Sequence, residues 1–249
     1  MRGRLHVAPD ADSLARTAAD EFQVYAWEAI RARGRFTAAL AGGDTPRAAY
    51  AQIAATWRKW SDGPLDWARV HIFWGDERHV PPDDPRSNYR MARETLISHV
   101  PLPPENVHPI PAAHPDPRDA AARYSGALRE FFELEPRGLP RFDLVLLGMG
   151  ADGHTASLFP GSDALEEDGR LAVATRGPAG DEWRITLTLP VLNHAGSLVV
   201  LVSGAAKAST LRRVLEGPET APSLPIQRLN PDSGSLVWIV DREAAPWIR

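Results

Sequence analysis

The chain has 249 residues, a formal net charge of -4, 43% hydrophobic and 24% charged residues, and no cysteine. This composition is typical of a soluble globular protein, and we expect one domain over residues 1–249. The acidic balance argues against nucleic acid as a partner, and the missing cysteines exclude disulfides and a thiol nucleophile. Because no membrane span or signal pattern is found, we expect a cytoplasmic protein with no membrane partner.

The first half of the chain alternates between helical and extended patterns. The strand Val70–Trp74 is followed by the long polar loop GDERHVPPDDPRSNY, and long loops in compact domains are usually functional or disordered. Four tryptophans, Trp57, Trp60, Trp67 and Trp74, are expected in the core. The other predicted elements are helices over Asp12–Arg33, Thr45–Trp57, Asn88–His99 and Asp119–Leu134 and a strand over Phe36–Leu40.

The second half continues the alternation. A strand over Phe142–Leu147 runs into a Gly-rich turn, and a helix is expected to open at Ser203 or Gly204. Alternation within RITLTL predicts a less completely buried strand. The remaining predicted elements are strands over Leu171–Thr175, Arg184–Leu189, Leu198–Val202 and Leu236–Val240 and a short helix or turn over Pro190–Ala195.

Several of these strands are continuous apolar runs, as expected where helices cover both faces of a parallel sheet. We therefore predict a Rossmann-like α/β fold, with a doubly wound, mostly parallel sheet and helices on both faces. Ligands of such folds bind beyond the carboxyl ends of the strands. Four loops fall at that edge: AGGDTP, GDER, GMGADGH and SGAAK.

The GMGADGH turn has the G-x-G-x-x-G spacing of a dinucleotide site. That fingerprint needs a full helix after the glycines and an acidic residue at the end of the next strand. Here Phe159-Pro160-Gly161 limits the expected helix to about two turns, and the acidic residues precede the next strand. The context contradicts nucleotide binding. Dispersed histidines and the lack of G-x-S-x-G likewise disfavour a metal centre and a serine hydrolase.

The same turn places Asp152 and His154 two residues apart. Histidine is the side chain best suited to take a proton near neutral pH, and a carboxylate can orient its ring. The glycines of the turn, Gly150 among them, let backbone N–H groups approach a small substrate closely. The alternative is that Asp152 caps a helix and His154 is a surface residue.

The other three loops carry candidate binding residues. Gly42, Gly43 and Thr45 precede a helix whose N-terminus can bind phosphate, although a plain tight turn capped by Asp44 or Thr45 fits as well. Lys207 can meet a phosphate as a point charge or be solvated.

The polar loop after Trp74 adds Asp76 and Arg78, which lie in a charged stretch that is either solvated or functional. An arginine here can grip an anion in two-point fashion. Asn88 can bond sugar hydroxyls or cap the next helix.

Taken together, GDER followed by SNY, and then GMGADGHTASLFPG, resemble the 6-phosphogluconolactonases, within a family that includes glucosamine-6-phosphate deaminases. AGGDTP, RITLT and SGAAK fall where that family has its other motifs, so the resemblance covers residues 36 to 240. It implies hydrolysis of a sugar-phosphate lactone without metal, nucleotide or other cofactor. A monomer or small homo-oligomer is expected.

The resemblance also implies roles by position. His154 matches the histidine that activates water and Asp152 the neighbouring carboxylate, while Arg78, Arg184 and Lys207 match basic positions facing the substrate. Asp44 departs from the serine usual in the first turn, and repulsion from a phosphate predicts that it points away. In the deaminases a glutamate precedes the proline of the block. Here Phe159 stands there, which favours the lactonase over a deaminase, and a non-catalytic sugar-phosphate sensor remains a third alternative.

Overall fold

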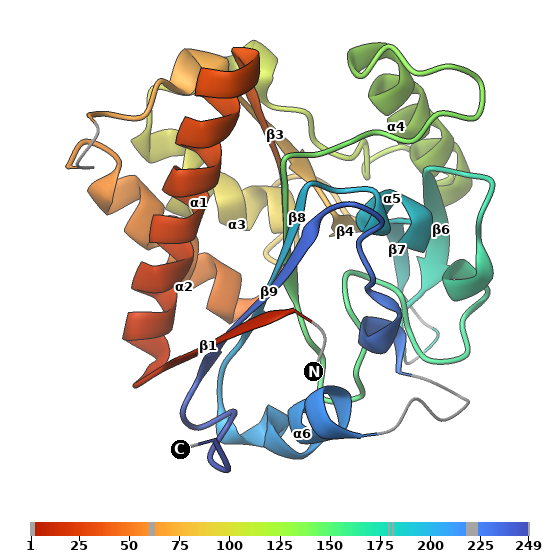
Figure 1. Ribbon diagram of the computed structural model, residues 1–249. Helices are drawn as coiled ribbons and strands as arrows, with labels where there is room; N and C mark the ends of the chain where they lie inside the picture. Colours follow the sequence, from red (N-terminus) through yellow and green to blue (C-terminus); the bar gives the residue numbers. More distant parts are fainter. Residues whose placement is uncertain (1–2, 60–62, 179, 181, 218–223, 249) are drawn as a thin grey trace.

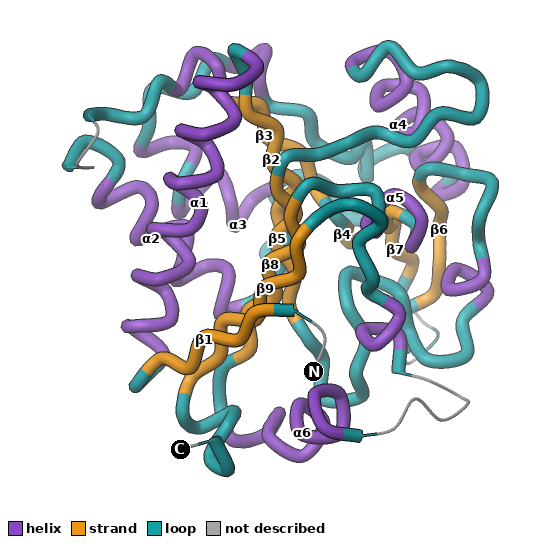
Figure 2. The backbone as a smooth tube through the Cα atoms, in the orientation of Figure 1, coloured by secondary structure: helices purple, strands orange, loops and turns teal. Residues whose placement is uncertain are grey.

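A six-stranded parallel sheet forms the centre of the molecule (Figures 1 and 2), in the order β1-β9-β8-β5-β2-β3. The computed structural model describes all residues except 1–2, 60–62, 179, 181, 218–223 and 249. The sheet confirms the predicted parallel α/β architecture. Its strands are β1 (Arg4–Ala8), β2 (Phe36–Leu40), β3 (Val70–Trp74), β5 (Leu144–Gly148), β8 (Ser197–Val202) and β9 (Ser235–Asp241).

Helices cover both faces of this sheet, as predicted. On one side lie α1 (Ala11–Arg33), α2 (Asp44–Thr56) and α3 (Asn88–Thr95). On the other side lie α4 (Pro117–Phe131) and α5 (Leu189–Asn193), and α6 (Ala208–Glu216) lies past the end of β8. The core includes Trp57, Trp67 and Trp74, all buried as expected, whereas Trp60 lies outside the described residues.

A second, three-stranded antiparallel sheet stands beside the main one, in the order β4 (Asp76–Arg78), β7 (Trp183–Leu187) and β6 (Ala172–Arg176). The sequence predicted a loop where β4 lies and did not separate β6 and β7 from the main sheet. Gly75 explains the change of sheet, because its N–H donates to Leu40 O in β2 and its carbonyl accepts from Leu187 N in β7. β4 could not be predicted because it is short and charged, has no apolar pattern, and pairs with β7, which is distant in the sequence.

One strand was missed and one further expectation was wrong. The edge strand β1 was missed, because its alternate residues are exposed and it is only five residues long. The helix expected after Gly153 does not form; the chain makes turns there instead. Gly153 and Ala156 have φ values of 82° and 48°, in the left-handed region that a right-handed helix excludes. Asp152 therefore caps no helix.

Candidate functional site

A cavity of about 230 Å³ opens where β2, β3, β5 and β8 end and the small sheet begins. The structure brings nearly all the predicted site residues together around it. Asp152 does not line it but contacts His154, which does. The predicted residues that line the cavity are Gly42, Gly43, Thr45, Asp76, Arg78, Asn88, Gly150, His154, Arg184 and Lys207.

The imidazole of His154 is held from three directions. Its Nδ1 lies 2.6 Å from Asp152 Oδ1, and the same oxygen accepts from the His154 backbone N–H at 3.1 Å. The ring packs against Phe159, with centroids 4.7 Å apart. Gly150 lies so close that a Cβ there would overlap Nδ1 and Cε1 of the ring. Gly150 is thus needed for the ring's position, and Nε2 is left as the available nitrogen of a partly exposed side chain.

Contacts with His154 explain why the pKa of Asp152 is lowered. Burial raises this pKa, but the backbone N–H, the charge and the ring of His154 together outweigh burial and hold it below the usual 3.8. The carboxylate therefore stays ionised at neutral pH. An ionised carboxylate on Nδ1 fixes the tautomer of the ring and leaves Nε2 to accept a proton, as a general base must.

Thr155 and Ser157, on either side of Ala156, support the loop rather than line the cavity. Thr155 donates its hydroxyl to Gly148 O at 2.9 Å, and Ser157 donates to Asp76 Oδ2 at 2.6 Å. Ala156 sits between them with a left-handed φ and lines the cavity. A non-glycine residue in this region is strained, and such strain persists where neighbours over-determine it. The sequence gave no signal for the Ser157–Asp76 contact.

Two predicted arginines lie directly opposite each other on the neighbouring antiparallel strands β4 and β7. In the β4–β7 register Arg78 lies opposite Arg184, and like charges in directly opposed positions repel. Arg184 lies over the Phe159 ring, its Cζ 5.7 Å from the centroid. The Nε atoms of both arginines are buried with no acceptor among the described residues. The pair is therefore well suited to an anionic or strongly polar ligand.

Lys207 belongs to a short 3-10 turn, Ala205–Lys207, that precedes α6, so it lies just before the helix rather than inside it. Burial lowers its pKa, and the charges of Asp241 and Asp44 oppose that shift without reversing it. Asp241 is buried and accepts from Ser203 Oγ and Gly204 N–H. It thereby fixes the loop that carries Lys207, a function that the sequence did not reveal.

The first Gly-rich turn is held by side chains outside it. Tyr50 Oη both donates to Ala41 O and accepts from Ala41 N at 2.8 Å. A Cβ at Gly42 would overlap the Asn88 amide, so only glycine fits there. Asp44 is fully exposed, makes no cap to α2 and lies 3.8 Å from Arg47. Asp44 is nevertheless among the residues that line the cavity, so its pointing away from a ligand stays a prediction, and the cap suggested for it is absent.

Several polar residues near the cavity are engaged within the protein. Asn88 donates to Asp76 O at 2.9 Å, and Ser87, not Asn88, caps α3. Glu77, which the sequence did not single out, accepts from the N–H groups of Arg78, Asn88 and Tyr89. Burial raises the Glu77 pKa despite these bonds. Glu77 therefore organises the loop after β4.

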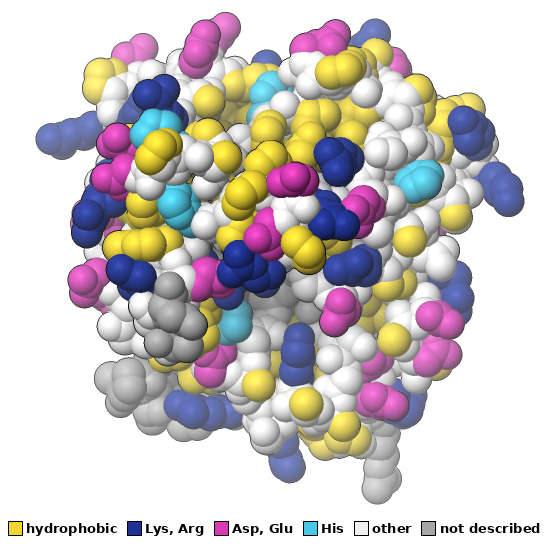
Figure 3. All heavy atoms as spheres, turned by 180° about the vertical axis from the view of Figure 1, so that it is seen from behind, with side chains coloured by type: hydrophobic (Ala, Val, Ile, Leu, Met, Phe, Trp, Pro, Cys, Tyr) yellow, Lys and Arg dark blue, Asp and Glu magenta, His cyan; other side chains and the backbone are white. Residues whose placement is uncertain are grey.

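The backbone amides of the GMGADGH turn, expected to approach a substrate closely, are partly engaged and therefore poorly suited to stabilise negative charge on it. Gly150 N–H donates to His154 O at 2.9 Å and Gly153 N–H donates to Gly150 O at 3.0 Å. The arginines are thus the better candidates for that function. Within the described part of the chain, no group of three or more His, Asp or Glu side chains could hold a metal ion. Viewed from behind, Lys and Arg side chains gather near the middle of the surface, with Asp and Glu between them (Figure 3).

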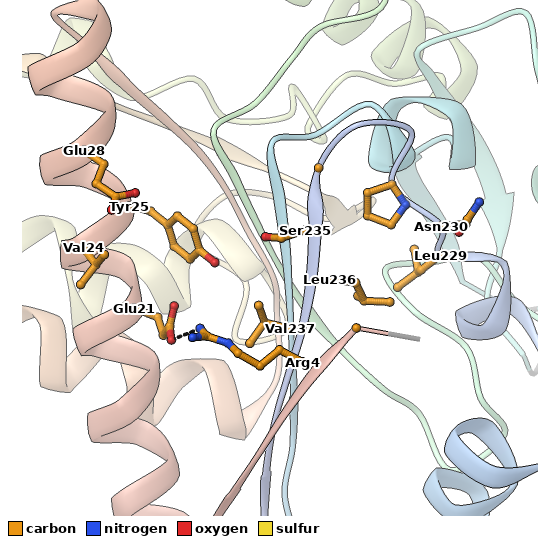
Figure 4. Close-up of a pocket in the computed structure, with 13 residues that line it drawn as sticks. Arg4, Glu21, Val24, Tyr25, Glu28, Leu229, Asn230, Ser235, Leu236 and Val237 are labelled. Carbon is orange, nitrogen blue, oxygen red and sulfur yellow. Dashed lines mark hydrogen bonds and ion pairs between the residues drawn. The ribbon is translucent and has the colours of Figure 1, made fainter. Parts of the chain in front are cut away.

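A larger cavity of about 580 Å³ lies elsewhere, between α1, β1 and β9 (Figure 4). An ion pair between Arg4 and Glu21 crosses it, and the Tyr25 ring projects from α1 toward the strands. None of the predicted site residues lines it. Convergent cations and an oriented imidazole distinguish the smaller cavity, which we take as the site. No helix among the described residues is long and apolar enough to cross a membrane.

Comparison with known proteins identifies the family of the chain. Residues 9–238 match the family described as glucosamine-6-phosphate isomerases/6-phosphogluconolactonase. A 6-phosphogluconolactonase of Synechocystis sp. is 42% identical over 222 residues, 89% of this chain and 88% of that one. The solved 6-phosphogluconolactonase from Trypanosoma cruzi is 27% identical, with a TM-score of 0.85 over 99% of this chain and 97% of that one. A monomeric glucosamine-6-phosphate deaminase, 19% identical with a TM-score of 0.80 over 99% of this chain and 100% of that one, shares the fold.

Proposed function

We propose how this site works from the premise that the chain belongs to the family of glucosamine-6-phosphate isomerases and 6-phosphogluconolactonases. Its activity is the hydrolysis of 6-phospho-D-glucono-1,5-lactone to 6-phospho-D-gluconate, a step of the oxidative pentose phosphate pathway. The substrate carries a phosphate at one end and an ester carbonyl at the other. The site must therefore hold an anion and deliver water to a carbon some distance away.

Cations and a helix N-terminus provide the anion site. Gly43 is the N-cap of α2 and supplies no side-chain cap, so the first amides of this helix have no side-chain acceptor there, and Gly43, Asp44 and Thr45 all line the cavity. Lys207 lines the same cavity. We assign the phosphate to Gly42, Gly43, Thr45 and Lys207, and the polar groups of the sugar to Arg78 and Arg184.

His154 is the general base in this proposal. With Nδ1 held by Asp152, Nε2 takes a proton from water as the water oxygen attacks the lactone carbonyl carbon. Negative charge develops on the carbonyl oxygen, where an arginine stabilises it. The C–O bond to the ring oxygen then breaks, and the imidazolium returns the proton to that oxygen. Asp152, ionised throughout, stabilises the imidazolium.

One observation carries the assignment: His154, with Nδ1 held by Asp152, lines the same cavity as Lys207 and the two arginines. The deaminase alternative is disfavoured at Phe159. This residue packs on the His154 ring, where the deaminases have a glutamate, and a phenyl ring cannot relay a proton.

The test is His154→Asn, assayed on freshly generated lactone and corrected for its spontaneous hydrolysis. We expect kcat to fall by about 10²–10⁴, the usual value of general base catalysis, with binding of 6-phosphogluconate nearly unchanged. His6→Asn, at an exposed histidine on β1, is the matched control. A wild-type rate in His154→Asn removes the histidine from this mechanism. Ammonia release from glucosamine 6-phosphate would favour the deaminase, and product binding without turnover a sensor.

A further inference from the structure

The two pocket arginines are connected outside the cavity by one carboxylate. Arg184 Nη2 donates to Glu182 Oε2 at 2.8 Å, and the other carboxylate oxygen, Oε1, accepts from Arg86 Nη1 at 3.2 Å. The carbonyl of Arg86 in turn accepts from Arg78 Nη1 at 2.7 Å. Glu182 thus contacts Arg184 directly and reaches Arg78 through Arg86.

Arg86 is itself fixed in place. Its guanidinium donates from Nε and Nη2 to the two oxygens of Asp84, at 3.0 and 2.9 Å, and its backbone N–H donates to Asp84 Oδ1 at 2.8 Å. The segment that supplies the carbonyl to Arg78 is therefore anchored from within the same loop. The Glu182–Arg86 contact joins this loop to the β6–β7 hairpin.

Burial makes the Glu182–Arg184 pair more than a solvent-exposed ion pair. The side chains of Glu182 and Arg184 are 21% and 17% exposed, whereas the arginines of the other described Arg–Glu pairs are 31% to 70% exposed. Glu182 does not line the cavity. Its carboxylate offsets the repulsion between Arg78 and Arg184 from behind, and their remaining N–H groups stay free for a ligand.

We propose that Glu182 is a positioning residue for the substrate: it holds Arg184, and through Arg86 also Arg78, in the orientation that binds the sugar-phosphate lactone. This inference rests on the proposed function, in which the arginines contact the substrate. Holding the guanidinium groups in advance spares the ordering of two long side chains on binding. The loss of Glu182 therefore weakens binding of substrate and product alike, while proton transfer at His154 continues.

Glu182→Gln tests the proposal, because the amide keeps the shape but can accept from only one arginine and carries no charge. We expect the KM for the lactone and the Kd for 6-phosphogluconate to rise about tenfold, with a smaller fall in kcat because an arginine also stabilises the charge that develops on the carbonyl oxygen. In Glu182→Gln/Arg184→Met, the loss of binding should be smaller than the two single losses combined, since part of the Glu182 effect passes through Arg184 and only the part that passes through Arg86 to Arg78 remains. Glu94→Gln, which breaks the surface Arg90–Glu94 pair on α3, is the matched control.

The outcomes separate the two proposals. If KM and Kd are unchanged in a folded Glu182→Gln variant while the wild-type protein hydrolyses the lactone, the positioning function is overturned. The proposed function then still stands. A parallel fall in kcat and melting temperature without a KM effect assigns Glu182 to fold stability and overturns the positioning function too. Failure of the wild-type protein itself to hydrolyse the lactone contradicts the proposed function instead.

Discussion

Asp152 Oδ1 receives both the backbone N–H and the ring Nδ1 of His154, so one carboxylate oxygen fixes the main chain and the side chain of the same residue. This geometry is possible because the two residues are separated only by Gly153, whose φ of 82° bends the chain back. The orientation of the imidazole is thereby determined by local structure, without a distant partner.

Asp152→Asn separates orientation from charge at this pair. The asparagine oxygen can still accept from the histidine, but no negative charge stabilises the imidazolium. We expect kcat to fall by about tenfold to a hundredfold, less than in His154→Asn, with KM nearly unchanged. Steady-state kinetics with fresh lactone measure both values. An unaltered kcat would show that the charge of Asp152 contributes nothing to the reaction.

Gly150→Ala should displace the catalytic ring. The added methyl group would occupy the space of His154 Nδ1 and Cε1, so the imidazole must turn away from its present position. We expect kcat to fall at least tenfold, because displacing a reacting group by about 1 Å can lower the rate about a hundredfold. Gly126→Ala is the control: its Cβ meets nothing within 4 Å in α4, and alanine there should raise stability by about 0.5–1 kcal/mol. Full activity in Gly150→Ala would mean that the loop adapts freely.

The location of the site could be predicted because it depends on features that a sequence displays. Apolar runs such as LVVLV identify parallel strands, and the ends of parallel strands meet at one edge. The loops carrying Gly42, His154 and Lys207 were therefore expected to converge, and they do.

What could not be predicted depends on pairing between distant residues. The opposition of Arg78 and Arg184 needs the β4–β7 register, and the Ser157–Asp76 bond joins the loop after β5 to β4. The same holds for Asp241, which fixes the Lys207 loop from the end of β9. The short helix expected after Gly153 was wrong because side-chain bonds of Thr155 and Ser157 draw that segment into turns.

Lys207 gives the site a pH dependence of predictable sign. Burial holds its pKa below the usual 10.5, so it loses its charge at a lower pH than a free lysine does. Because only the protonated form attracts a phosphate, the Kd for 6-phosphogluconate should rise as pH increases through that lowered pKa. Calorimetric titrations from neutral to alkaline pH measure this. Lys207→Arg, always charged, should flatten the profile, whereas Lys59→Arg, at the only other lysine of the sequence, should not. Identical profiles for all three proteins would exclude Lys207 from the anion site.

A pair of histidines far from the cavity should limit stability in acid. His108 Nε2 lies 3.3 Å from His71 Nδ1, and the His108 ring stacks on Phe73 with centroids 4.3 Å apart. Burial, and then the neighbouring His71, lower the His108 pKa to about 4, and burial with the charge of Arg35 lowers that of His71.

The sign of the effect follows from the lowered pKa values. The folded protein resists protonation of these rings, whereas an unfolded chain binds protons near pH 6.5. Stability contributed by the neutral pair is thus complete above about pH 6.5 and is lost as pH falls from there toward 4. His108→Phe keeps an aromatic ring on Phe73 and removes one proton-binding group. Its urea midpoint should therefore drop less between pH 7.5 and pH 5 than that of the wild type or of His99→Phe, at an exposed histidine. Equal drops in all three proteins would show that the pair is protonated in the folded state without penalty.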